Sequence, residues 1–215
     1  MENRKTYYQL ILDRSGSMSS SIEETVAGVN SQLRRIREIA GRFPEQELYT
    51  SLCLFNSSVT RAFDRLLPER LTEISYSDYR PTGNTALYDA VGECIQYLQR
   101  NIGHEIERNE ASVVVVIFTD GYENASRQFS HHRISSMIKE LEQTDKWTFS
   151  YVGATIDAVD IAINLNIRAS NAMRYGVENY MEEIKNVADR LNDYAWEKCE
   201  GRITKDFLKK KDPDQ

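Results

Sequence analysis

The chain has 215 residues, of which 40% are hydrophobic and 28% charged, and its formal net charge at pH 7 is −6. This composition is typical of a soluble globular protein and excludes a disordered, collagen-like or coiled-coil chain. The acidic balance argues against a nucleic-acid binder, because such proteins usually carry a basic surplus. The length suits one domain, which we expect over residues 1–200, with a charged C-terminal tail over 201–215.

The cysteines and the apolar segments indicate where the protein works. Cys53, Cys94 and Cys199 lie far apart and form no C-x-x-C motif, so neither a disulfide framework nor a zinc site is indicated. No apolar run approaches the roughly 20 residues that span a bilayer, and the first residues lack the features of a secretory signal. We therefore expect a cytoplasmic protein that binds neither membranes nor nucleic acid.

Predicted strands and helices alternate along the chain. Apolar, aromatic or alternating residues predict strands over 6–12, 47–55, 59–66, 112–118, 147–152 and 167–170. Helices, most of them with apolar residues three or four positions apart, are predicted over 21–40, 85–108, 131–143, 157–165 and 177–199. From about residue 202 we expect a frayed, charged tail.

The order and character of these segments predict an α/β fold. Residues 112–118 are apolar without alternation, which is typical of a parallel strand buried on both faces. The short turn over 56–58 joins two strands as a hairpin and so predicts one antiparallel strand at an edge. Strands that alternate with helices indicate a doubly wound, mostly parallel sheet with helices on both faces, a three-layer arrangement.

Hard oxygen ligands follow the strands of this predicted sheet. Such sheets bind ligands beyond the carboxyl ends of their strands, where we expect five side chains: Asp13, Ser15, Ser17, Thr85 and Asp120. If the chain stays extended after its first strand, alternate residues from position 13 to position 17 point the same way. Carboxylates and hydroxyls suit Mg²⁺, Mn²⁺ or Ca²⁺. Two carboxylates only neutralise such an ion, which could then accept a further carboxylate from outside.

The segments D-R-S-G-S (13–17), G-N-T-A-L (83–87) and F-T-D-G (118–121) carry a specific resemblance. The sequence resembles the von Willebrand factor A domain family, whose metal-ion-dependent adhesion site is D-x-S-x-S followed by a distant Thr and a distant Asp. All five positions match in order, and the resemblance covers about residues 5–200. It implies a Rossmann-like domain with a six-stranded sheet.

The resemblance also implies roles for the five residues. Ser15, Ser17 and Thr85 would bind the metal directly, and Asp13 and Asp120 often through water. A Glu or Asp of a partner protein would take the remaining position, so we expect a binding module and not an enzyme. The chain is most similar to intracellular, bacterial-type members, which often work beside AAA+ ATPases or stress-resistance systems.

Two other functions and one local alternative stay open at this stage. A metal-dependent phosphohydrolase would also place an Asp at a strand end, but it needs a second Asp where Ser15 stands. A scaffold whose site never holds metal is the other function. Several loop residues are expected near the metal end, where they form a binding surface or simply pack: Tyr79, Arg80, Tyr88, Tyr122, Glu123 and Asn124. Glu123 could also occupy the metal's open position.

Overall fold

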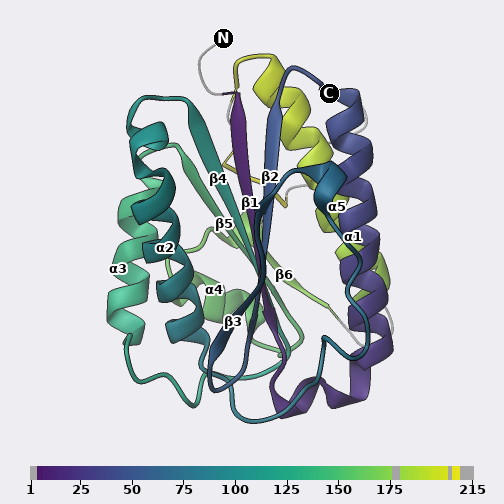
Figure 1. Cartoon of the computed structure of the whole chain (residues 1–215). Coiled ribbons are helices and arrows are strands. Elements are labelled where there is room, and N and C mark those ends of the chain that lie inside the picture. Colours follow the sequence, from purple (N-terminus) through teal and green to yellow (C-terminus); the bar gives the residue numbers. More distant parts are fainter. Residues whose placement is uncertain (1–3, 176–179, 203–204, 209–215) are drawn as a thin grey trace.

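A six-stranded sheet forms the centre of the computed structural model, which describes residues 4–175, 180–202 and 205–208 (Figure 1). The strands are β1 (Lys5–Asp13), β2 (Glu47–Phe55), β3 (Val59–Leu66), β4 (Ala111–Thr119), β5 (Trp147–Gly153) and β6 (Ala172–Arg174). Their spatial order is β3-β2-β1-β4-β5-β6. Every neighbouring pair is parallel except β2 and β3, which are antiparallel. The predicted α/β fold with one antiparallel edge strand is confirmed.

Helices cover both faces of the sheet (Figure 1). They are α1 (Ile22–Arg42), α2 (Leu87–Glu107), α3 (His131–Glu142), α4 (Ala158–Asn164) and α5 (Tyr180–Cys199). One face packs against α1 and α5, and the other against α2, α3 and α4. Within the described ranges, no helix has both the length and the apolar character needed to cross a bilayer.

The middle strand β4 is buried along its whole length, as its unbroken apolar sequence predicts. Val114 and Val116 pack into the core beneath α1 and α5, whereas Val113, Val115 and Ile117 pack into the core beneath α2, α3 and α4. Full burial of one such aliphatic side chain is worth about 1.5–3 kcal/mol. This strand therefore belongs to both cores, and it places its carboxyl end firmly between those of β1 and β5.

Two predicted boundaries near the sheet differ from the structure. The strand predicted over 167–170 is wrong: a 3-10 turn occupies Ala169–Asn171, and the last strand, β6, follows it. The reason is local. The Ile167 N–H donates to the carbonyl of Ala162 in α4, and the Asn171 N–H donates to the carbonyl of Arg168. The helix predicted from 85 begins at Leu87, and the start predicted at 177 for the last helix lies outside the described residues.

Part of the predicted tail packs on the core. Phe207 and Leu208 are buried, and the Phe207 ring contacts the rings of Tyr8 and Tyr194. Asn171 fixes this segment, since its amide donates to the carbonyl of Lys205 and its Oδ1 accepts the Leu208 N–H. The prediction of a frayed tail is therefore wrong for residues 205–208, where two apolar side chains add to the core beneath α5.

The last turn of α5 is fixed to the amino-terminal ends of β1 and β4. Lys198 Nζ donates to the carbonyl oxygen of Lys5 at 2.6 Å, to Thr6 Oγ1 at 2.7 Å and to Ser112 Oγ at 2.8 Å. Burial lowers the pKa of Lys198 to about 7, because the charged ammonium loses its water. This buried lysine links α5 directly to the sheet, at the edge opposite the predicted metal residues.

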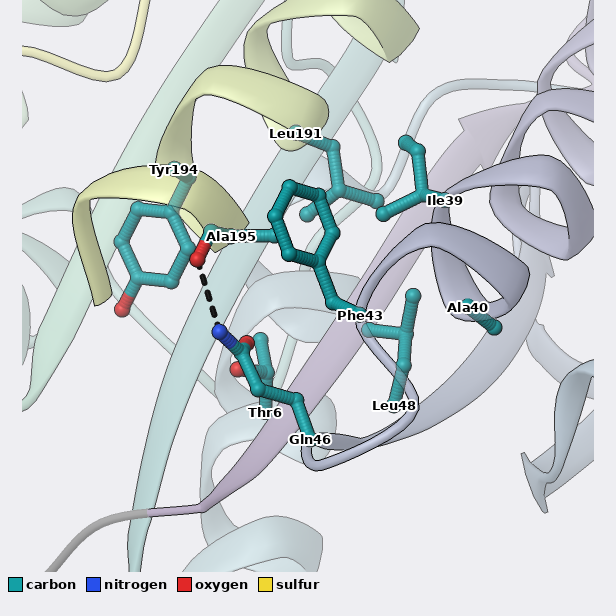
Figure 2. Close-up of a pocket in the computed structure, with 9 residues that line it drawn as sticks. All are labelled: Thr6, Ile39, Ala40, Phe43, Gln46, Leu48, Leu191, Tyr194 and Ala195. Carbon is teal, nitrogen blue, oxygen red and sulfur yellow. Dashed lines mark hydrogen bonds between the residues drawn. The ribbon is translucent and has the colours of Figure 1, made fainter. Parts of the chain in front are cut away.

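A small pocket lies beside this contact, between α5, α1 and the start of β2 (Figure 2). Side chains such as Phe43, Leu48 and Leu191 line it, and Gln46 Nε2 closes one side by donating to the Ala195 carbonyl at 2.7 Å. Its volume of about 10 Å³ leaves room for about one water molecule. The pocket is therefore a packing gap beneath α5 and too small for an organic ligand.

Candidate metal centre

The five predicted site residues come from three segments that meet at the carboxyl edge of the sheet. Asp13 ends β1, and Asp120 directly follows β4; the two strands are parallel neighbours, with Leu12 opposite Phe118. Thr85 lies in the loop that leads into α2. The structure thus brings together segments that are 35 and more residues apart in the sequence.

The turn after β1 is tighter than predicted. Ser15 is extended, but Gly16–Ser21 forms a 3-10 helix, so the chain does not continue as a strand through Ser17. The Ser15 N–H donates to Asp13 Oδ1 at 2.7 Å, and the two serine Oγ atoms lie 3.0 Å apart. The predicted extended geometry is therefore wrong, and the oxygens converge because the backbone curls back on Asp13.

Hydroxyl groups hold both carboxylates in place. Ser17 Oγ donates to Asp120 Oδ1 at 2.7 Å, which connects the turn after β1 to the end of β4. Thr119 Oγ1 donates to Asp13 Oδ2 at 2.6 Å. Each carboxylate therefore has a fixed orientation, and the hydroxyls that fix them come from the neighbouring segment.

Thr85 is held by the loop that follows β4. Its N–H donates to Asn124 Oδ1 at 2.9 Å, and its carbonyl accepts the N–H groups of Asn124 and Ala125. The Ala86 N–H donates to the carbonyl of Asn56 at 2.8 Å. Although Thr85 lies two residues before α2, its backbone is therefore as firmly placed as it would be inside the helix.

Gly121 shows how closely the oxygens approach one another. A Cβ added at Gly121 would lie 3.2 Å from Thr85 Oγ1, 3.4 Å from Ser17 Oγ and 3.9 Å from Asp13 Oδ2. Oxygens from the turn after β1 and from Thr85 thus surround one small space beside Gly121, which itself follows Asp120, and a side chain at this position would fill that space. With the Ser15–Ser17 and Ser17–Asp120 contacts, all five predicted side chains belong to one cluster.

The electrostatics of the cluster favour a cation. Burial raises the pKa of Asp13 above its usual range, although hydrogen bonds from Thr119 and Ser15 oppose the shift. Burial also raises the pKa of Asp120, against the hydrogen bond from Ser17. In the part of the chain that the structure describes, neither carboxylate forms an ion pair with Lys, Arg or His. A bound cation would supply the missing positive charge.

The donor types also fit a hard divalent ion. Two carboxylates and three hydroxyls offer only oxygen, which Mg²⁺, Mn²⁺ and Ca²⁺ prefer over the nitrogen and sulfur ligands of zinc and copper. No group of three or more His, Cys, Asp or Glu side chains suited to a metal occurs among the described residues. The cluster does not depend on such a group, because three of its five side chains are hydroxyls.

Two of the loop residues expected near the metal end have structural roles. Tyr79 is buried, and its hydroxyl donates to the carbonyl oxygen of Asp13 at 2.6 Å, so it supports the site from inside. Glu123 accepts the N–H groups of Tyr88, Ala125 and Ser126 and the Ser126 hydroxyl. Its carboxylate is thus engaged at the start of α2, and the suggestion that it occupies the metal's open position is wrong for this structure.

Sequence reasoning missed two residues that position the site. Thr119 orients Asp13, and the only sequence signal for it is its place next to Asp120 at the end of a buried strand. Asn124 is among the loop residues expected near the metal end, but the sequence does not show that its side chain holds the backbone of Thr85. Both act through contacts with residues more than 35 positions away, which local spacing does not predict.

A doubly wound α/β domain with an oxygen-rich cluster at the carboxyl edge is the class that fold and site define. Residues 9–190 match the family model of the von Willebrand factor type A domain. The chain therefore belongs to this family, and the resemblance read from its three short segments is confirmed at that level. No curated protein sequence matches the chain.

Solved structures share the fold at low sequence identity. The ArnB paralog VWA2 from Sulfolobus acidocaldarius has 15% identity and a TM-score of 0.59, over 86% of this chain and 46% of that one. Manganese-loaded Plasmodium vivax TRAP protein has 18% identity and a TM-score of 0.55, over 86% of this chain and 74% of that one. The mussel byssus proximal thread matrix protein 1 with a zinc-occupied MIDAS motif has 15% identity and a TM-score of 0.54, over 89% of this chain and 46% of that one. This chain thus spans less than half of the first and the third of these proteins.

Proposed function

We propose that this chain is a metal-dependent protein-binding module with an intact metal-ion-dependent adhesion site. Ser15, Ser17 and Thr85 would bind Mg²⁺, or Mn²⁺ or Ca²⁺, directly, and Asp13 and Asp120 would complete the site through water. An Asp or Glu of a partner protein would take the open position. Two observations carry this proposal. Oxygens of Thr85, Ser17 and Asp13 converge on the space beside Gly121, and Ser17 is bonded to Asp120. Among the described residues, no cationic side chain is paired with either carboxylate.

The donor set favours binding over catalysis. Neutral hydroxyls give up little electron density, so a metal held by three of them would stay a strong acceptor for an outside carboxylate. A phosphohydrolase built on Asp13 would need a second carboxylate two residues later, and the Ser15 hydroxyl there contacts Ser17 instead. The metal-loaded TRAP and byssus structures support a divalent metal at this place in the fold.

The cellular setting is proposed on separate grounds. The three cysteines are free thiols, two of them buried, which suits the reducing cytoplasm of a cell. The likeness to bacterial-type family members suggests an AAA+ ATPase or a stress-resistance protein as the partner. A pull-down with Mg²⁺ and with EDTA, followed by mass spectrometry, would name the metal-dependent partner.

Calorimetry of the metal-stripped protein tests the proposed site. Titration with Mg²⁺ and with Mn²⁺ is expected to show one site per chain. Added acetate is expected to tighten binding, because it supplies the carboxylate that a partner would bring. The absence of binding to either metal, with and without acetate, would contradict the proposal.

Gly121→Ala is expected to weaken Mn²⁺ binding at least about tenfold while the fold stays intact. The added methyl group would lie 3.2–3.9 Å from oxygens of Thr85, Ser17 and Asp13, in the space the ion needs. Gly103→Ala is the matched control, because a Cβ at that position of α2 meets nothing within 4 Å. Calorimetry measures the affinities; equal affinity of both variants would place the metal elsewhere.

A further inference from the structure

Large apolar side chains are exposed beside the candidate metal centre. Ile156 is 80% exposed, Tyr122 54%, Ile163 48% and Val159 37%. Aliphatic residues are usually buried, so several exposed ones in one region mark an interaction surface. We call these four residues the α4 patch.

Three members of the patch lie on one side of α4 and the segment just before it. Ala158 and Ala162 are fully buried and pack into the core with α2 and α3. Val159 and Ile163, four positions apart in α4, form a short ridge on the outer side of the helix, and Ile156 is exposed in the turn just before it. The described residues bury the inner side of α4 and leave this outer ridge to solvent.

Tyr122 connects the ridge to the metal centre. It directly follows Gly121, the residue around which the metal-site oxygens gather. Its hydroxyl donates to Asp157 Oδ1 at 3.0 Å, next to Ile156, so the ring lies between the cluster and the start of α4. The apolar surface therefore begins beside the proposed metal and continues along α4.

The patch carries negative charge at its border. Asp157 accepts the Tyr122 hydroxyl, and Asp160, in the first turn of α4, is exposed. No Lys or Arg is paired with either carboxylate among the described residues. A segment that lies on the patch would gain from basic residues beside its apolar ones, which gives the occupant a defined chemistry.

We propose that the partner presents an amphipathic helix to this surface. An Asp or Glu at one end of that helix binds the metal, aliphatic residues three or four positions apart pack on the α4 patch, and Lys or Arg side chains face Asp157 and Asp160. A ridge of helical spacing fits a second helix because such ridges interdigitate. This inference rests on the proposed function, and it adds a partner class to the acidic residue.

A displayed library of helical peptides provides the probe. Peptides are selected on the wild-type protein with Mg²⁺ and eluted with acid, and their affinities are measured with Mg²⁺ and with EDTA by fluorescence anisotropy. The selected peptides are expected to carry one acidic residue, helically spaced aliphatic residues and basic residues beside them. Peptides that share the acidic residue alone would overturn the inference.

Surface variants then separate the patch from the metal. The double variant Ile156→Ser/Ile163→Ser is expected to bind the selected peptides at least about tenfold more weakly, with unchanged Mn²⁺ affinity. Leu67→Ser is the control, because Leu67 is as exposed as Val159 but follows β3, at the opposite edge of the sheet. Both variants alter exposed side chains, so the fold is expected to persist.

The outcomes distinguish the two proposals. Metal-dependent peptide binding that is equal in wild type and double variant would overturn the amphipathic partner and leave the metal-dependent module standing. A second outcome would overturn the metal-dependent function. In it, the double variant no longer binds the peptides, but the wild type still binds them in EDTA and Asp120→Ala still binds them with Mg²⁺. Loss on both metal removal and patch substitution supports the inference.

Discussion

Asp120→Ala is expected to raise the dissociation constant for Mg²⁺ and Mn²⁺ by more than about 100-fold, beyond the cost typical of removing a residue that only supports a ligand. It removes one of only two carboxylates in the cluster, and metal-dependent capture of a partner should disappear with it. The fold should remain, because Asp120 follows β4 and gives up one side-chain hydrogen bond, from Ser17, worth about 1–3 kcal/mol. Calorimetry and circular dichroism measure the two effects.

Asp160→Ala is the matched control for this experiment. Asp160 is an exposed carboxylate on α4, outside the cluster, and its removal changes the net charge by the same amount. The control is expected to bind Mn²⁺ as the wild type does, and it applies to metal affinity alone because Asp160 borders the α4 patch. If Asp120→Ala retained wild-type affinity, the cluster around Gly121 would not be the metal site.

Lys198→Met is expected to change how stability depends on pH. Burial lowers the pKa of Lys198 to about 7 in the folded chain, from the value of 10.5 that is usual for a lysine in water. Between these values the unfolded chain binds the proton and the folded chain does not, so the free energy of unfolding rises with pH. From pH 7 to pH 9 the gain is up to about 2 kcal/mol, and it falls away as the pH drops toward 7.

Urea denaturation at pH 7 and pH 9 measures this effect. Methionine cannot titrate, so the wild type should gain stability relative to Lys198→Met as the pH rises. Lys139→Met is the control, since Lys139 is an exposed lysine in the last turn of α3 and should leave the pH dependence unchanged. Parallel pH profiles of the wild type and Lys198→Met would show that the buried lysine stays charged in the folded protein.

The sequence predicted the parts of the site that depend on strand ends and spacing. Asp13 and Asp120 follow apolar strands whose parallel arrangement is recognisable, so their meeting at one edge could be expected. The tight turn that brings Ser17 to Asp120 could not be predicted, because its 3-10 geometry depends on contacts with Gly83 and Asp13. That the five side chains bind metal stays a prediction.

Other features escaped prediction because they depend on distant partners. The strand β6 has three residues, too few to show a pattern, and its position follows from the turn over 169–171. Phe207 and Leu208 lie in a charged segment and are buried only because Tyr8, Tyr194 and Asn171 are near them. The exposure of the apolar ridge of α4 was likewise not predicted, because apolar residues in a short helix indicate burial of all its sides.

The two edges of the sheet differ from its middle in a way that bears on self-association. At one edge, the pairing of β2 with β3 shifts register twice, and Arg65 has a positive φ of 46°. At the other edge, β6 offers only three residues for pairing. Irregular or very short edge strands are poor templates for another strand. The chain should thus resist polymerising by strand addition even when it is concentrated, and its contacts with other proteins should form through side chains.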